Sequence, residues 1–130
     1  MSKKLKLLAV DDDFINLKLI HSMLKNNPDI NEVIEAKDGL DALNKLKDID
    51  DIDIILLDIK MPIMNGIEFM ENISLLPEKK NIPIIILTTD ETMKHKAFDS
   101  GAFDFIVKPI REHDLHAKIS KVKKILEDFK

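Results

Sequence analysis

The chain has 130 residues and a formal net charge of −4, and it contains no cysteine. The missing thiols exclude disulfides, thiolate metal sites and cysteine nucleophiles, and the acidic balance argues against direct binding of nucleic acid. A chain of this length builds a single core, so residues 1–130 are expected to form one domain. No apolar run approaches the roughly 20 residues of a membrane span, and the start lacks a secretory signal. We therefore expect a cytoplasmic protein that makes no membrane contact.

Apolar runs of strand length alternate with segments of helical period along the chain. Strands are expected at about 5–10, 31–36, 53–58, 83–88 and 103–107. The third and fourth runs are apolar on both faces and rich in β-branched residues, which is typical of parallel strands covered by helices on both sides. The pattern predicts an α/β protein built from five βα units around a doubly wound parallel sheet.

Each predicted helix carries apolar residues three or four positions apart, which mark the face turned toward the sheet. The fourth helix, at about 91–100, offers only Met93, Ala97 and Phe98, so we expect it to be the most weakly anchored. The other faces are Leu17, Ile20 and Leu24 in the first helix, Leu40, Leu43 and Leu46 in the second, Ile67, Met70 and Ile73 in the third, and Leu115, Ile119, Val122, Leu126 and Phe129 in the last.

Residues that carry or bind charge stand at the carboxyl ends of four predicted strands. In a doubly wound sheet, ligands bind outside these ends, at the point where the strand order reverses. The sequence therefore predicts one site to which several strands contribute. Its candidate residues are Asp11, Asp12 and Asp13 after the first strand, Asp58 at the end of the third, Thr88 at the end of the fourth and Lys108 after the fifth. Asp13 is interpreted as the N-cap of the first helix.

The carboxylates of Asp11, Asp12 and Asp58 should converge, and such a cluster is most simply held ionised by a hard divalent cation. Mg²⁺ characteristically takes one or two carboxylates and keeps several waters. One carboxylate can also act as a nucleophile toward phosphorus and form an aspartyl phosphate. The hydroxyl of Thr88 and the ammonium of Lys108 would then meet the phosphoryl oxygens, because phosphoryl transfer needs mainly positioning and charge neutralisation.

Four strings of residues, at 10–13, 57–66, 86–88 and 101–109, carry a family resemblance over essentially the whole chain. They read Val-Asp-Asp-Asp, Leu-Asp-Ile-Lys-Met-Pro-Ile-Met-Asn-Gly, Ile-Leu-Thr and Gly-Ala-Phe-Asp-Phe-Ile-Val-Lys-Pro. The chain resembles a receiver domain of a two-component response regulator, of the stand-alone type. The resemblance implies a flavodoxin-like (βα)5 fold with strand order 2-1-3-4-5. It also implies a switch phosphorylated by a sensor histidine kinase or a histidine phosphotransfer protein, with an unknown downstream protein as partner.

The resemblance further implies roles for single residues. Asp58 is the phosphoacceptor, and Mg²⁺ is bound directly by Asp12 and Asp58, through water by Asp11 and by the backbone carbonyl of Lys60. Thr88 and Lys108 bind the phosphoryl group. Thr88 then moves toward the phosphoryl group and Phe105 turns inward, which changes the face formed by the fourth helix, the fifth strand and the fifth helix. Lys108-Pro109 resembles the cis peptide of the family.

Lys60, Thr89 and Asp90 are expected at the mouth of the site. Lys60 and Asp90 are predicted to face each other and to form an exposed ion pair. With the bulky Thr89 beside them, this pair would obstruct the approach of water to the acyl phosphate and prolong its lifetime.

Two other functions remain open from the residues alone. One is a phosphatase of the haloacid dehalogenase type, whose first motif would use Asp11 and Asp13. The helix that follows Lys108 and the short chain weigh against it. The other is an interaction module that works without phosphorylation. Because the last helix runs to Lys130, output is expected to pass through another protein, unless the chain is part of a longer one.

Overall fold

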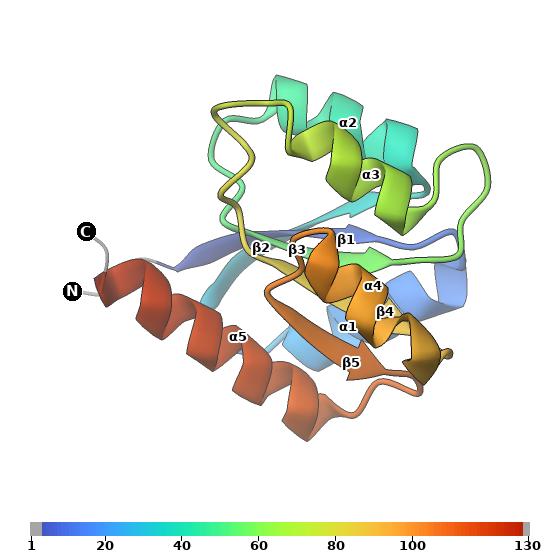
Figure 1. Ribbon diagram of the computed structural model, residues 1–130. Helices are drawn as coiled ribbons and strands as arrows, with labels where there is room; N and C mark the ends of the chain where they lie inside the picture. Colours follow the sequence, from blue (N-terminus) through green and yellow to red (C-terminus); the bar gives the residue numbers. More distant parts are fainter. Residues whose placement is uncertain (1–3, 129–130) are drawn as a thin grey trace.

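Parallel strands form the centre of the molecule in the computed structural model, which describes residues 4–128 (Figure 1). They are β1 (Leu5–Val10), β2 (Ile30–Ala36), β3 (Ile54–Asp58), β4 (Ile84–Thr88) and β5 (Asp104–Val107). Their order is β2-β1-β3-β4-β5, and every neighbouring pair is parallel. The predicted doubly wound sheet with strand order 2-1-3-4-5 is confirmed. The order reverses between β1 and β3, where a sheet of this topology binds ligands.

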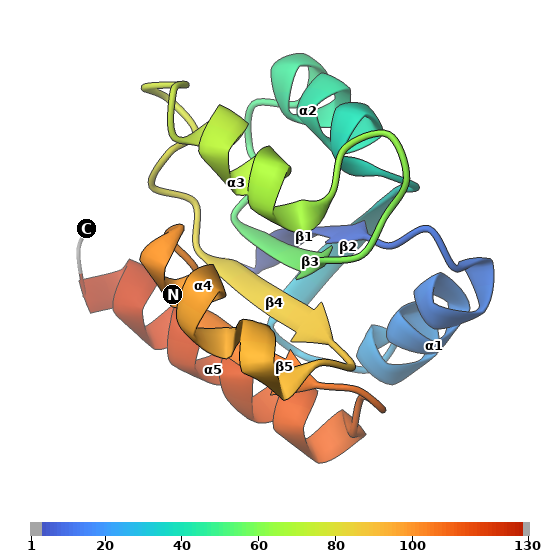
Figure 2. The ribbon, with the colours of Figure 1, turned by 45° about the vertical axis from the view of Figure 1, so that its right-hand side comes forward.

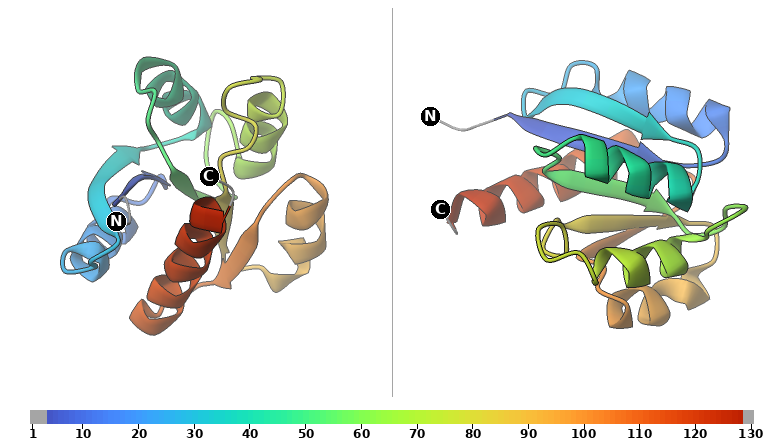
Figure 3. Two further views of the ribbon diagram at one scale, coloured as in Figure 1. Left: turned by 90° about the vertical axis from the view of Figure 1, so that its left-hand side faces the viewer. Right: turned by 90° about the horizontal axis from the view of Figure 1, so that it is seen from above.

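Helices cover both faces of the sheet (Figures 2 and 3). One face carries α1 (Phe14–Leu24) and α5 (Glu112–Asp128), and the other carries α2 (Gly39–Asp48), α3 (Gly66–Ile73) and α4 (Lys94–Asp99). Successive strand residues point to opposite faces. Leu8 and Val10 of β1 therefore join the core beneath α2 and α3, whereas Leu7 and Ala9 join the core beneath α1 and α5. All residues of β3 and β4 are buried, as their two-sided apolar runs predict. No helix of the described chain is long and apolar enough to cross a membrane.

Side-chain caps fix the helix starts that lie beside the carboxyl ends of the strands. Asp13 accepts a hydrogen bond from the backbone N–H two residues later at 2.9 Å, which confirms it as the N-cap of α1. Asp38 caps α2 in the same manner. Asn65 and Glu68 form a reciprocal capping box at the start of α3. The loops that follow β1 and β3 in the candidate site are therefore held at the strand on one side and at a capped helix on the other.

The fourth helix is weakly anchored, as predicted. A short 3-10 turn, η1 (Glu91–Met93), leads into α4, and neither α4 nor η1 contributes a buried residue other than Ala97. Phe98 of α4 is 40% exposed. Few buried apolar contacts mean that a segment opens at low free energy, so this part of the chain can move without disturbing the core.

The predicted face of the second helix is partly wrong, because Leu40 is 47% exposed. Leu43 and Leu46 are buried as expected, and Ala42 takes the remaining core position. The helix begins only at Gly39, and Leu40 in its first turn points away from the sheet. In the last helix Leu115, Ile119 and Val122 are buried, whereas Phe129 lies outside the described residues.

Candidate functional site

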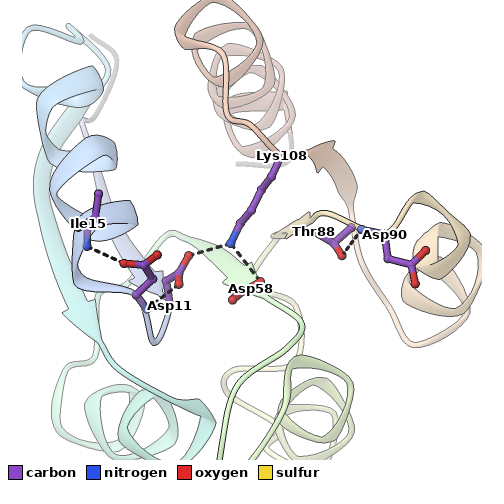
Figure 4. A network of polar contacts seen from close by, with 7 residues as sticks. Asp11, Ile15, Asp58, Thr88, Asp90 and Lys108 are labelled. Atoms are coloured by element: carbon purple, nitrogen blue, oxygen red, sulfur yellow. Dashed lines mark hydrogen bonds and ion pairs between the residues drawn. The ribbon is translucent and has the colours of Figure 1, made fainter.

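Acidic side chains meet where β1 and β3 end (Figure 4). One oxygen from each of Asp11, Asp12 and Asp58 lies within 4.8 Å of the others. Asp11 and Asp58 are buried and Asp12 is exposed, so the cluster opens to solvent on one side. Asp11 is fixed in place because its Oδ1 accepts a hydrogen bond from the backbone N–H of Asp13 at 2.9 Å. Carboxylate oxygens are the ligands that Mg²⁺ prefers, and the convergence of these three side chains fits such an ion.

Lys108 supplies positive charge to the same cluster. Its Nζ lies 3.1 Å from Oδ2 of Asp11 and 3.3 Å from Oδ1 of Asp58. Both contacts are drawn as dashed lines in Figure 4. Burial disfavours the charged ammonium, but the charges of Asp58 and Asp11 outweigh this effect and raise the pKa of Lys108. The lysine is therefore held protonated between two carboxylates. It is also placed to meet an anionic group that is added to either of them.

The surroundings of Asp58 oppose the ionisation of its carboxyl group. Burial, and then the negative charge of Asp11, raise the pKa of Asp58 to about 6, although Lys108 acts in the opposite direction. One ammonium therefore does not neutralise the cluster. A bound cation would favour the ionised carboxylate, which is the form that can act as a nucleophile.

Thr88 is the last residue of β4, and Phe105 lies in the neighbouring strand β5. Thr88 is buried, and its Oγ1 accepts a hydrogen bond from the backbone N–H of Asp90 at 3.0 Å. The backbone N–H of Lys108 donates to the carbonyl of Thr88 at 2.7 Å, which ties the end of β4 to the residue that follows β5. Phe105 is only 7% exposed and packs in the core on the face of the sheet that α2, α3 and α4 cover. The ring of Phe105 is therefore inside the molecule in this structure.

The mouth of the site opens into a hollow of about 640 Å³ between the β3–α3 loop and α4. Its lining includes Asp12, Lys60, Met61 and Met93. Lys60 lies in this loop, two residues after Asp58, and both Lys60 and Thr89 are exposed. Of the three residues expected at the mouth, Lys60 lines this hollow.

The predicted ion pair between Lys60 and Asp90 is not formed within 4.0 Å among the described side chains. The carboxylate of Asp90 instead accepts hydrogen bonds from the backbone N–H and the hydroxyl of Thr92, as the N-cap of η1. These bonds, and to a smaller extent the charge of Lys60, hold the pKa of Asp90 below its usual value. A local cap costs less ordering of side chains than an exposed ion pair, which contributes little.

Gly66 is a site residue whose role the sequence analysis missed. A Cβ at this position would lie 2.6 Å from the carbonyl oxygen of Asp58 and 2.9 Å from Cα of Ile59. Only glycine lets α3 begin so close to the end of β3. The signal in the sequence is the Asn-Gly pair at 65–66, a dipeptide that is typical of turns.

The fold and the site together define a class: an α/β protein with a carboxylate and lysine site at the switch point of a doubly wound sheet. The chain matches the response regulator receiver domain model over residues 7–120. It belongs to this family and is a receiver domain of the kind found in two-component systems.

Relatives and solved structures agree with this assignment. The chain is 33% identical over 120 residues to the cyclic di-GMP phosphodiesterase response regulator RpfG of Xanthomonas campestris, covering 91% of this chain and 32% of that protein. It is 36% identical over 118 residues to the histidine-protein kinase BarA of Escherichia coli, covering 89% of this chain and 12% of that protein. The chain thus spans about a third or less of these curated relatives. The chemotaxis protein CheY4 of Vibrio cholerae superposes with a TM-score of 0.83 at 31% identity, covering 92% of this chain and 99% of that one.

The phosphatase of the haloacid dehalogenase type is not favoured. The family match covers most of the chain, and Asp13, which that mechanism would need in the site, has its side chain engaged as the N-cap of α1. The enzymatic activities in the names of some relatives belong to those longer proteins.

Proposed function

We propose that this receiver domain works by accepting a phosphoryl group on Asp58. The observation that carries the proposal is the convergence of Asp11, Asp12 and Asp58 with the Nζ of Lys108 between two of them. An oxygen of the Asp58 carboxylate attacks the phosphorus of a phosphohistidine. The new P–O bond forms as the P–N bond breaks, and the imidazole leaves with the bonding electron pair and takes up a proton.

The other residues of the site neutralise and position the transferred group. Asp11, Asp12, Asp58 and the backbone carbonyl of Lys60 would hold Mg²⁺, which supplies positive charge to the phosphoryl oxygens when it is bound. Lys108 forms a second positive contact, since its ammonium already lies 3.3 Å from Asp58. The hydroxyl of Thr88 donates a hydrogen bond to a phosphoryl oxygen. The chain promotes its own phosphorylation and dephosphorylation and has no separate substrate.

The phosphodonor in this proposal is a sensor histidine kinase or a histidine phosphotransfer protein. One relative that this chain matches over 118 residues is itself a signal transduction histidine-protein kinase, BarA. The donor must bring a histidine to the mouth of the site, where α1 begins directly after the acidic cluster. Phe14 and Ile15 in the first turn of α1 are 62% and 73% exposed, so an apolar surface lies beside the mouth. Such a surface supports docking of a partner protein.

Incubation with acetyl phosphate and MgCl₂, followed by intact mass analysis and peptide mapping, tests the proposal. We expect one added phosphoryl group on Asp58, and no adduct when EDTA replaces MgCl₂. Steady turnover of the donor without an adduct would indicate a phosphatase instead. No reaction at all would favour the remaining alternative, an interaction module that works without phosphorylation.

Phosphorylation is proposed to reach the output face through Thr88. A movement of its hydroxyl toward Asp58 would lengthen the 3.0 Å hydrogen bond that it accepts from the N–H of Asp90. Asp90 is the N-cap of η1, and η1 leads directly into α4. The path from the site to α4 is therefore short, and α4 is the helix with least apolar anchoring. The downstream protein would bind the face formed by α4, β5 and α5.

Hydrogen exchange with and without fluoroberyllate, in the presence of Mg²⁺, measures this coupling. We expect the largest change at residues 89–105, because they include the Asp90 cap, η1 and α4. The required coupling is of ordinary allosteric size, about 1–3 kcal/mol. A Thr88→Ala variant should bind the mimic with a smaller exchange change in α4. Changes confined to α1 and α2 would contradict the proposed path.

A further inference from the structure

The loop between β3 and α3 is attached to the start of α2. The backbone N–H of Gly39 donates a hydrogen bond to the carbonyl of Met64 at 3.2 Å. A Cβ at position 39 would lie 2.7 Å from both the Cγ and the carbonyl oxygen of Met64. Side chains do not approach so closely, so this attachment requires a residue without a Cβ atom.

The start of α2 is itself rigid and can therefore hold the loop. Asp38 is buried and accepts a hydrogen bond from the N–H of Asp41 at 2.8 Å. Asp41 in turn accepts one from the N–H of Lys37 at 3.0 Å. These two bonds fix the first turn of the helix in a way that resembles a capping box, with the second bond made to the residue before the N-cap. The N–H of Gly39 is thus presented to the loop by a well-fixed backbone.

The loop is also held at its other end, where the N–H of Gly66 donates to the carbonyl of Ile59 at 2.8 Å. Between the two attachments, Ile63 has a positive φ of 69°. This conformation is unfavourable for a β-branched residue and persists only where the surroundings impose it. Because the side chain of Ile63 is 76% exposed, its own packing does not compensate. The attachments on both sides help to hold this conformation, together with the hydrogen bond that spans Ile63 from the N–H of Met64 to the carbonyl of Pro62.

A displacement of Met64 would be transmitted to Lys60 along a stiff stretch of chain. Pro62 has a fixed φ, and its carbonyl accepts a hydrogen bond from the N–H of Met64 at 2.7 Å. Only three residues separate Met64 from Lys60, and the turn between them leaves little freedom to absorb a shift. The position of the Lys60 carbonyl therefore depends on Met64, and through Met64 on Gly39.

We propose that Gly39 is a positioning residue for the Mg²⁺ site, acting through Met64 on the Lys60 carbonyl. The inference rests on the proposed function, in which that carbonyl is a metal ligand. Groups that orient a metal ligand from outside typically change metal affinity about 10–100-fold when they are altered. Gly39→Ala inserts a methyl group that Met64 must avoid, so it should weaken Mg²⁺ binding about tenfold.

Titration of isotope-labelled protein with MgCl₂, followed by amide NMR, gives both the affinity and the place of the change. We expect Gly39→Ala to raise the Kd for Mg²⁺ about tenfold, with altered amide shifts over residues 59–65. The matched control is Gly101→Ala. Gly101 has a positive φ of 110° and no atom within 4 Å of its missing Cβ, so alanine strains the backbone without crowding the β3–α3 loop. Its Kd should stay within twofold of the unsubstituted protein.

Each outcome bears on the inference. Equal Mg²⁺ affinity in the Gly39→Ala and Gly101→Ala proteins would overturn the role of Gly39 and leave the proposed function standing. If the unsubstituted protein did not bind Mg²⁺, the proposed function would fall and this inference with it. Should Gly39→Ala not fold, Asp38→Ala loosens the same turn without adding atoms. It should also raise the Kd, and an unchanged Kd in that variant would overturn the inference.

Discussion

Replacing Asp58 by asparagine is expected to abolish phosphorylation by acetyl phosphate. The amide has nearly the shape of the carboxylate but offers no anionic oxygen to attack phosphorus. Asp11 and Asp12 remain in the Asp58→Asn protein. If either of them were the nucleophile, the variant would still be phosphorylated. Intact mass analysis under conditions that label the unsubstituted protein fully should show no adduct. Full labelling of Asp58→Asn would show that another residue accepts the phosphoryl group.

Thermal unfolding of the Asp58→Asn protein shows whether the variant folds. We also expect its free energy of unfolding to differ from that of the unsubstituted protein in a pH-dependent way. Ionised Asp58 is disfavoured in the folded state, because its pKa is raised to about 6. Without metal, the folded state is therefore destabilised by this group as the pH rises from about 4 through about 6, and fully so at pH 7. A neutral amide removes that cost. We expect a gain of roughly 1–2 kcal/mol at pH 7 after screening at the open mouth, and little difference at pH 4.

The convergence of the site could be predicted from the sequence because it depends on topology. Asp11, Asp58, Thr88 and Lys108 each stand at the carboxyl end of an apolar run, and parallel strands bring these ends to one edge. No detail of side-chain geometry was needed for that step. The N-cap role of Asp13 was also predictable, because capping is set by residues that are near in sequence.

Contacts that depend on competition between partners could not be predicted in the same way. Asp90 has two possible partners, and the cap to Thr92 forms instead of the ion pair to Lys60. The position of Phe105 depends on the space in a core assembled from several elements, which spacing along the chain does not reveal. The contact between Gly39 and Met64 could not be predicted from the sequence either. The Asp-Gly pair marks a helix start, but only the folded chain shows which residue needs the empty space.

Mg²⁺ is expected to raise the unfolding temperature of this protein strongly. Asp11, Asp12 and Asp58 lie within 4.8 Å of one another, and Lys108 only partly offsets their repulsion. A ligand that binds the folded state alone stabilises it by about 2.7 kcal/mol at a hundred times its Kd. For a domain of this size that corresponds to roughly 8–10 °C. Differential scanning fluorimetry over a MgCl₂ series measures the gain.

Asp12→Ala should remove most of this gain, because it removes a ligand that is exposed and has no other role in the fold. Asp13→Ala is the matched control: it should lower stability by about 1 kcal/mol through the lost cap and keep the full response to Mg²⁺. The gain in unfolding temperature from Mg²⁺ should also depend on pH. Below about pH 6 the proton on Asp58 competes with the metal, so the gain should be smaller at pH 5 than at pH 7.5. An equal gain at both pH values, or an unchanged response in Asp12→Ala, would contradict a metal site built on these carboxylates.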